Sequence, residues 1–423
     1  MSVAGVPIFG ATIDFTNGAA LISSAFTLGN TGNKGKLGTA QLADADDSVD
    51  ISDIAISCAI RRGRNRILDT FEAGTAILTL RDDNGDFNPD NVNGAYYGKI
   101  LPLRKIQIYA DFNGVRYVLF WGFIMSYTTQ FTRGVDDYAK VTLQCVDGFR
   151  LLNTQVFTAL TGAAAGDRTD QRITQLLDQA SWPSTQRSLD TGNTTVQADP
   201  GTANRNYLDS LQLIGDKTEY GGLYCDRSGN IVFLSRTNLA QRTAAPSTIY
   251  ADDGSGIGYQ GIELMQDDVL VVNDVTVQRL GGTAQNVQDT TSIATYFQHS
   301  GIRTGILVQS DTEALNQAQM LLATRKDSTL RISSLSLNLF DPTASTRIIA
   351  GLNTDIFDPI QVTKSMPGNT TITKTLFVQG INHDMTKRSF DTKLITAEPI
   401  IKAFVLDDPQ EGVLDSNNGF LSY

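Results

Sequence analysis

The chain has 423 residues, more than one hydrophobic core usually serves, so we expect two to four domains. Apolar residues make up 41% of it and charged residues only 19%, and its 37 glycines and 11 prolines favour a β-rich globular protein over a coiled coil or a disordered chain. The net charge of −11, from 34 basic and 45 acidic residues, argues against a protein that wraps duplex DNA, because affinity for phosphate comes from Lys and Arg.

Cysteine usage and the N-terminus limit the compartment. Cys58, Cys145 and Cys225 are far apart and form no CxxC pair, which predicts neither a disulfide framework nor a zinc site. The N-terminus lacks the basic and apolar regions of a signal peptide, and no stretch approaches about eighteen uninterrupted apolar residues. We therefore expect a soluble protein that is made in a cytoplasm.

The first 150 residues are expected to form an arm and a β-domain. Residues 1–50 are rich in Gly, Ala, Thr and Asp, which predicts an N-terminal arm or a decorated first strand. Over residues 51–150, apolar and β-branched runs alternate with turns, as is typical of a β-domain. Asn113 and Gly114 separate two such runs and predict a hairpin.

Residues 151–258 are expected to form a small α+β insertion domain. One helix is predicted from apolar residues at helical spacing, namely Ile173, Leu176, Leu177 and Ala180. A second helix is predicted in NYLDSLQLIGDK, and two apolar runs around Ser228 and Gly229 predict a hairpin.

Residues 259–400 return to β character, with one helix predicted at 311–325. Ser310 and Glu313 form a capping box there, in which each side chain satisfies a backbone N–H at the helix start. The apolar face of this helix is expected to consist of Leu315, Ala318, Leu321 and Leu322. The last stretch, 401–423, has one lysine and four acids and is expected to be a C-terminal acidic arm.

Two stretches of the chain resemble each other. Residues 101–124 and 358–381 share Ile-Gln-Ile or Ile-Gln-Val, then a turn glycine, Gly114 or Gly368, then Leu-Phe followed by Gly and Ile. Such similarity arises either from common hairpin chemistry or from two copies of one β-module. The second alternative would let a trimer present six similar modules in a ring.

The sequence carries no recognisable catalytic motif. The two histidines, His299 and His383, form no HExxH, and GxSxG and GxxxxGK[ST] are absent. The glycine-rich stretch that begins at 252 follows no convincing strand and opens no helix, so it is expected to be a loop and not a phosphate cradle. The acidic stretch 82–90 would need Gly and Glu where Phe87 and Asn93 stand to match an EF-type calcium loop, so its side chains are better explained as turn formers. We therefore predict no catalytic residue, no cofactor, no metal site and no enzyme.

Four arginines crowd the end of a predicted strand. Arg61, Arg62, Arg64 and Arg66 surround Gly63. One interpretation is a charged strand edge that prevents unwanted pairing. The other is a docking edge, because Arg binds carboxylates of a partner in a bidentate manner. These four residues are our interface candidates.

Several segments together resemble minor tail proteins of long-tailed bacteriophages. The N-terminal match comprises IRRGRNRILDTFEAGTAILTLRDDNGDFNPDN, YYGKILPLRKIQIYADFNGVRYVLFWGFI and TLQCVDGFRLL. Further matches are ITQLLDQASWP, LDTGNTTVQ, YGGLYCDRSGNIVF, VVNDVTVQRLGGTAQNVQDTTSIATYF and QAQMLLATR. In order, they span roughly residues 50–400, and the chain resembles the central hub of tail tips and baseplates.

The resemblance implies a mainly β homotrimer with two tube-like β-barrel modules per subunit, at 51–150 and 259–400, and the α+β insertion outside or below. It also implies a structural protein of the virion tail tip that adapts a sixfold tube to a threefold tip and forms part of the DNA conduit. Its expected neighbours are the distal tail protein or tail tube above, a spike, fibre or other tip protein below, and the tape measure protein. DNA would pass through the lumen without specific binding.

Two alternatives stay open. A hexameric distal tail protein ring would also carry a tube-like β-domain. A tail-associated cell-wall hydrolase would need a lytic domain with a polar cleft, for which 151–258 is small and poor in histidine.

Overall fold

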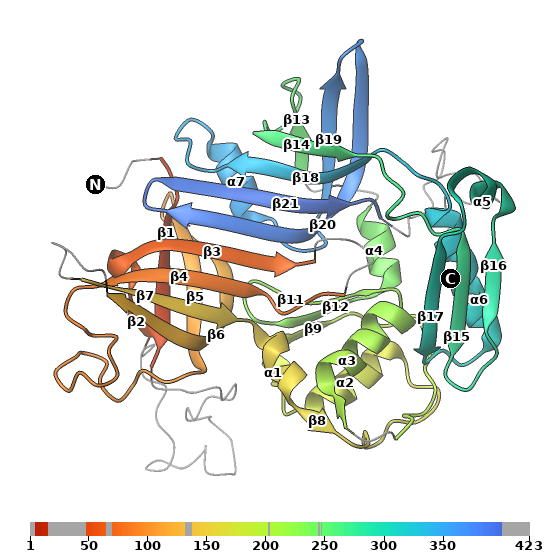
Figure 1. Cartoon of the computed structure of the whole chain (residues 1–423), viewed down its shortest axis with the longest axis horizontal. Helices are drawn as coiled ribbons and strands as arrows, with labels where there is room; N and C mark the ends of the chain where they lie inside the picture. The colour runs from red at the N-terminus through yellow and green to blue at the C-terminus, as the bar shows by residue number, and fades with distance from the viewer. Residues whose placement is uncertain are drawn as a thin grey trace.

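The structure is a computed structural model that describes residues 5–15, 48–64, 70–131, 138–201, 204–243, 246 and 248–399. A large, mostly antiparallel sheet occupies one side of the molecule, a helix-rich part lies against its end, and a small sheet with two helices stands at the far side (Figure 1). The predicted mainly β class with an α+β part is confirmed. Within the described residues, no helix is long and apolar enough to cross a membrane.

Thirteen of the described strands form the large sheet. In order across the sheet, its main path comprises β14 (Gly261–Met265), β18 (Arg331–Asn338), β21 (Ser389–Ala397), β20 (Thr370–Thr386), β3 (Ala55–Gly63), β4 (Thr75–Asp82), β7 (Ala139–Val146), β6 (Val115–Phe131), β5 (Arg104–Phe112), β1 (Ile8–Asp14) and β2 (Ser48–Asp50). β19 (Pro359–Met366) pairs with β20, and β13 (Thr248–Ala251) pairs with β19. The two β-regions thus share one sheet, and no barrel closes among the described strands of the single chain.

The sheet forms because apolar and polar side chains alternate along its strands. In β4, Ala76, Leu78 and Leu80 are buried and alternate with exposed or half-buried neighbours. One core includes Leu78 from the first β-region and Leu335 from the second. Burial of each such leucine stabilises the fold by roughly 1.5–3 kcal/mol, so the shared core holds the two regions together.

Two hairpins lie at the positions of the sequence similarity. β5 and β6 are joined by Asn113 and Gly114, whose φ angles of 51° and 78° are typical of a type I′ turn. This predicted hairpin is confirmed. β19 and β20 are joined by a turn that contains Gly368 and Asn369, with φ angles of 87° and 59°.

The described part of residues 1–50 belongs to the sheet. β1 pairs with β5 along its whole length, and Ile13 is fully buried in the shared core. This corresponds to the decorated-strand alternative. Residues 16–47 and the expected acidic arm at 401–423 lie outside the described residues.

The helix-rich part follows β7. Its helices are α1 (Gly148–Thr154), α2 (Thr169–Gln179), α3 (Tyr207–Gln212) and α4 (Arg236–Arg242), with η3 (Ser184–Gln186) and the π-helical η4 (Leu213–Thr218). Its strands are β8 (Val156–Phe157), β9 (Arg187–Leu189), β10 (Arg205–Asn206), β11 (Gly222–Cys225) and β12 (Ile231–Leu234). Both predicted helices and the β11–β12 hairpin are confirmed. In α2, Ile173, Leu176 and Leu177 are buried, whereas Ala180 is the C-cap.

A small three-stranded sheet is inserted between β14 and β18. It comprises β15 (Asp274–Arg279), β16 (Gln285–Gln288) and β17 (Ser300–Ile306), with α5 (Thr290–Tyr296) and α6 (Asp311–Arg325). The predicted capping box of α6 is confirmed, because Ser310 Oγ accepts from Glu313 N at 3.2 Å and Glu313 Oε2 accepts from Ser310 N at 3.3 Å. The buried face is centred on Ala314, Ala318 and Leu321, while Leu315 and Leu322 are half-buried.

The expectation of one helix between 259 and 400 is wrong. α5 and α7 (Ser345–Asn353) lie there as well. α5 is short and depends on its N-cap, Asp289, whose carboxylate accepts from Ser292 N at 2.9 Å. α7 buries Ile348 and Leu352, one helical turn apart, against the large sheet's core.

Candidate functional site

The two β-regions have the same strand order. Five strands of the first region lie in the order β3-β4-β7-β6-β5, and five of the second lie in the order β14-β18-β21-β20-β19. Along the chain, the five strands of each set occupy positions one, two, five, four and three of that spatial order. Common hairpin chemistry would not reproduce a five-strand order, so the structure favours the two-copy explanation of the sequence similarity.

Backbone details repeat at the same spacing. Leu103 and Phe357, just before β5 and β19, both have a positive φ, 63° and 64°. Their N–H groups donate to the carbonyls of Ile124 and Val378, both at 2.7 Å. Directly after each acceptor the pairing register shifts by one residue, which places a bulge in β6 and in β20. A strained conformation and a bulge at equivalent positions indicate the same local fold in both regions.

One of the three sequence anchors is not equivalent in space. Ile106 lies opposite Gly122, whereas its counterpart Ile360 lies opposite Leu376. The Ile-Gln and turn-glycine anchors therefore correspond between the hairpins, but the Leu-Phe pair is displaced along the strand. A bulge in the β5–β6 pairing and the different turn lengths explain why the sequence comparison misplaced it.

The two regions meet where β3 pairs with β20, and the four arginines were predicted at this strand end. Seven residue pairs run from Gly63 opposite Gly380 to Ser57 opposite Thr386. Gly63 has a φ of 95°, and a Cβ there would lie 2.2 Å from the Gln379 carbonyl oxygen. Only glycine fits this conformation and this approach, which explains its place among the arginines.

Arg61 binds across the junction at the surface. Its guanidinium donates to both carboxylate oxygens of Asp384, at 2.8 and 2.9 Å, and to the His383 carbonyl at 3.2 Å. The two side chains are 45% and 56% exposed. Such an ion pair orients the strands but adds little stability, because water screens it.

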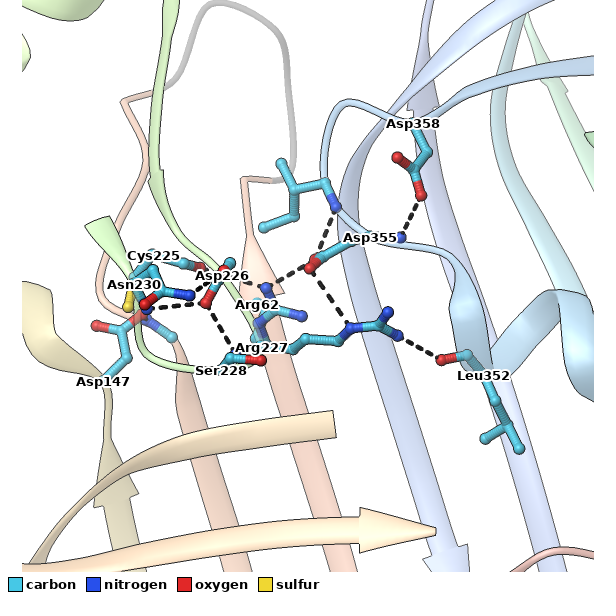
Figure 2. Close-up of polar contacts among 12 residues, drawn as sticks. Arg62, Asp147, Cys225, Asp226, Arg227, Ser228, Asn230, Leu352, Asp355 and Asp358 are labelled. Carbon is cyan, nitrogen blue, oxygen red and sulfur yellow. Dashed lines mark hydrogen bonds and ion pairs between the residues drawn. The ribbon is translucent and has the colours of Figure 1, made fainter. Parts of the chain in front are cut away.

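Arg62 is buried and links three parts of the chain (Figure 2). Its Nη2 donates to Asp355 Oδ1 at 2.8 Å and to the Cys225 carbonyl of β11 at 3.3 Å. Burial lowers the pKa of Arg62, but the carboxylate of Asp355 raises it more, so the pKa lies above its ordinary value. Asp355 in turn lies 3.9 Å from Nε of Arg227, whose Nη1 donates to the Leu352 carbonyl at 2.7 Å.

Asp147 stands beside this network and was not singled out in the sequence. It is the N-cap of α1, and its carboxylate accepts from Gly74 N at 2.6 Å and from Phe149 N at 3.0 Å. Burial raises its pKa to about 7. An Asp directly after a strand and before an apolar helical turn was the signal that could have found it.

Arg64 ties β3 to the bulge of β20. Its backbone N–H donates to the Gln379 carbonyl at 2.9 Å, and its Nε donates to Gln379 Oε1, also at 2.9 Å. The guanidinium carbon lies 4.4 Å from the centre of the Phe71 ring and 6.0 Å from that of Phe357. Arg66 lies outside the described residues.

The three described arginines therefore join parts of this chain to one another. Their inferred docking to a second protein stays a prediction. The partners Asp355 and Gln379 could not be chosen from the sequence, because they lie about 300 residues away from the arginines and many other acids and amides are available.

The histidines belong to different sheets. His383, in β20, donates to or accepts from Thr392 Oγ1 at 2.8 Å, and burial lowers its pKa to about 3. His299 precedes β17 and contacts the Tyr296 carbonyl at 2.9 Å. In the part of the chain that the structure describes, no three His, Cys, Asp or Glu side chains gather as metal ligands would.

Two solved structures that are similar to this chain are tail proteins. A tail protein from Neisseria meningitidis MC58 has a TM-score of 0.55 at 14% sequence identity, over 82% of this chain and 93% of that one. The 43 kDa tail protein of prophage MuSo2 from Shewanella oneidensis has a TM-score of 0.51 at 13% identity, over 82% and 94%. The chain has the fold of a phage tail protein.

The phage tail-protein fold covers most of the chain, and the predicted resemblance is confirmed at this level. A type VI secretion component of E. coli is a more distant match, with a TM-score of 0.43 at 9% identity over 82% and 73%, too low for a shared fold to be inferred. No protein-family model matches the sequence, and no curated protein does.

Proposed function

We propose that this chain is a structural hub protein of a bacteriophage tail tip, which adapts the sixfold tail tube to a threefold tip. One observation carries the proposal: the chain repeats one five-strand order twice within the fold of a phage tail protein. A homotrimer of such a chain would present six similar modules around its axis. Six modules in a ring would match the symmetry of a sixfold tube.

Each β-region would act as one tube-like module of that ring. In the single chain the described strands leave the sheet open, with β14 at one end and β2 at the other. A closed wall would therefore need neighbouring copies. The helix-rich part and the small β15–β17 sheet lie to one side of the large sheet in Figure 1, and in the proposed ring they would lie outside or below the wall.

The ring would form part of the DNA conduit during genome ejection. With a net charge of −11, the chain would repel phosphates more than it attracts them, so DNA would slide through without specific binding. The protein would reside at the virion tail tip, with the distal tail protein or tube above, a spike, fibre or other tip protein below, and the tape measure protein as a further neighbour. This role needs no chemical reaction.

The test is an averaged electron cryomicroscopy image of purified tail tips. We expect three copies of the chain around a local threefold axis, with both β-regions in the wall of the channel. Six copies in a hexameric ring would contradict the hub role and support a distal tail protein instead. Clearing of host cell walls by the purified chain in a zymogram would contradict a purely structural role.

A further inference from the structure

One edge of β20 holds two strands in succession. Phe377 pairs with Pro359 of β19 on one side and with Ala397 of β21 on the other. β21 occupies one edge of β20 as far as Thr386. β3 pairs with Gly380–Thr386, so it must lie on the opposite edge, beyond the end of β19. The β19 edge of β20 is thus completed by β3 of the other β-region.

The equivalent edge of β6 is open. Phe123 pairs with Lys105 of β5 on one side and with Val146 of β7 on the other. β7 continues along its side, but β5 ends opposite Ile124. Along Ser126–Phe131, the edge on the β5 side has no partner strand within the described residues.

A second open edge lies at the other end of the sheet. β14 takes the position in its region that β3 takes in the first, and it pairs with β18 on one side only among the described strands. In β20, the strand that fills the edge is β3. By the same equivalence, β14 is the strand expected at the open edge of β6. Within one chain, however, β14 lies far from β6, toward the opposite end of the sheet (Figure 1).

Side chains that are buried at the filled edge are exposed at the open one. Phe131 is 78% exposed and Met125 is 37% exposed, whereas their counterparts in β20, Met385 and Gln379, are each 1% exposed. The stretch Ser126–Phe131 also carries no charged residue, although free strand edges are usually protected by charge. Both features fit an edge that is covered in the assembled protein.

We propose that β14 of a second copy of this chain pairs with the Ser126–Phe131 edge of β6 and thereby repeats between subunits the β3–β20 junction. This inference rests on the proposed trimer and specifies its contact. Three junctions within chains and three between chains would then close one continuous ring of six modules.

The equivalence also fixes the register. At the junction within the chain, Cys58 lies opposite Met385, and on its other side it lies opposite Leu78. Ile262 in β14 lies opposite Leu335, which takes the position of Leu78 in the second region. Met385 and Phe131 are equivalent, because each follows the residue before its bulge, Val378 or Ile124, by the same number of positions. Ile262 of one subunit is therefore expected opposite Phe131 of the next.

The test is disulfide crosslinking of the full-length chain with Phe131→Cys and Ile262→Cys together. Directly opposed strand residues have Cα atoms within the range that a disulfide spans. After mild oxidation with diamide, we expect covalent dimers and trimers on a non-reducing gel, which dithiothreitol returns to monomers. A mixture of the two single variants should stop at dimers, because each chain then offers one cysteine to the contact.

Met385→Cys is the matched control. It places a cysteine opposite the native Cys58 at the equivalent junction, so oxidation should link the chain to itself without any covalent oligomer. The three native cysteines are buried inside the chain, so they cannot reach a second copy and should add no covalent oligomer to the background. A second variant, Phe131→Lys, should convert the trimer to monomers in light scattering, whereas Ile302→Lys, at a 69% exposed position of the small sheet, should not.

Two failures are distinguishable. A trimer in light scattering whose double-cysteine variant gives no crosslink would overturn the strand pairing and leave the proposed hub standing. A chain that stays monomeric up to the highest soluble concentration would overturn both.

Discussion

The two β-regions share a strand order but differ in how one edge is used. The edge of β20 beyond its bulge is filled by β3, and polar contacts from Arg61 and Arg64 fasten it. The edge of β6 beyond its bulge is open among the described strands, and Met125 in the bulge and Phe131 beyond it are exposed. The residue of β6 that corresponds to Asp384 is Gln130, which carries no charge, so the Arg61–Asp384 ion pair has no equivalent partner in β6.

One module can therefore form two kinds of contact, one within the chain and one between chains. A junction that forms once during folding tolerates buried charge and a glycine-dependent close approach, because the chain positions both sides at high effective concentration. A contact between subunits must form by encounter, for which apolar side chains on a free strand edge are suited.

Arg62→Met should have the largest effect on stability. It leaves the carboxylate of Asp355 and the Cys225 carbonyl without this donor inside the protein. Loss of one partner of a buried ion pair typically costs about 3–5 kcal/mol. Urea unfolding measures the change, and Arg62→Met with Asp355→Asn should recover part of it. An unchanged midpoint for the single variant would show that the junction does not depend on this network.

Gly63→Ala should weaken the filled junction more than Gly114→Ala weakens the hairpin turn. Both glycines have a positive φ, 95° and 78°, so a side chain costs about 1–2 kcal/mol at either site. Only at Gly63 would the Cβ also press on the β20 backbone, whereas nothing lies within 4 Å at Gly114. We expect a loss of about 2–4 kcal/mol against about 1–2 kcal/mol in thermal or urea unfolding. Equal losses would contradict the close approach of the two strands.

Asp147 should make stability fall as the pH rises. Its pKa in the folded chain is raised to about 7 by burial, whereas an unfolded Asp titrates near about 3.9. Between about pH 4 and 7 the folded state binds more protons at this group, so its contribution to the free energy of unfolding decreases with pH, by at most about 1.4 kcal/mol per unit, and is constant above.

Asp147→Asn checks this dependence in urea unfolding between pH 5 and 8. The variant should lose the decrease that the native chain shows. Glu398, which follows β21 as Asp147 follows β7, instead pairs with Lys374 near the surface. Glu398→Gln is therefore the matched control and should leave the slope in place. Identical profiles for Asp147→Asn and the native chain would refute the assignment.

Arg61→Ala should have the smallest effect. The pair with Asp384 is about half exposed, and exposed ion pairs contribute about 0–1 kcal/mol. A double-mutant cycle with Asp384→Ala measures the coupling, which should shrink further in 1 M salt. A coupling above about 2 kcal/mol would contradict a weak contact that water screens.

Local chemistry made several features predictable. Asn113 and Gly114 specify a tight turn because both adopt a positive φ, and Ser310 with Glu313 specifies a helix start because each satisfies a neighbouring N–H. The helical spacing of Ile173, Leu176 and Leu177 places them on one buried face. α7 was missed because its apolar residues also fit a short strand.

The sequence alone was enough to predict the mainly β class, two of the hairpin turns and the Ser310–Glu313 helix cap, because each depends on residues within a few positions of one another. It also indicated a repeated module, because two distant stretches carry the same local pattern. Only the tertiary structure decided that β3 joins β20, that Arg62 binds Asp355 across 293 positions, and that the corresponding edge of β6 has no partner strand among the described residues. The physical reason is that the backbone hydrogen bonds of one strand edge are the same as those of any other. Which edges meet is therefore settled by bulges, glycines and side chains that come together only in the folded chain.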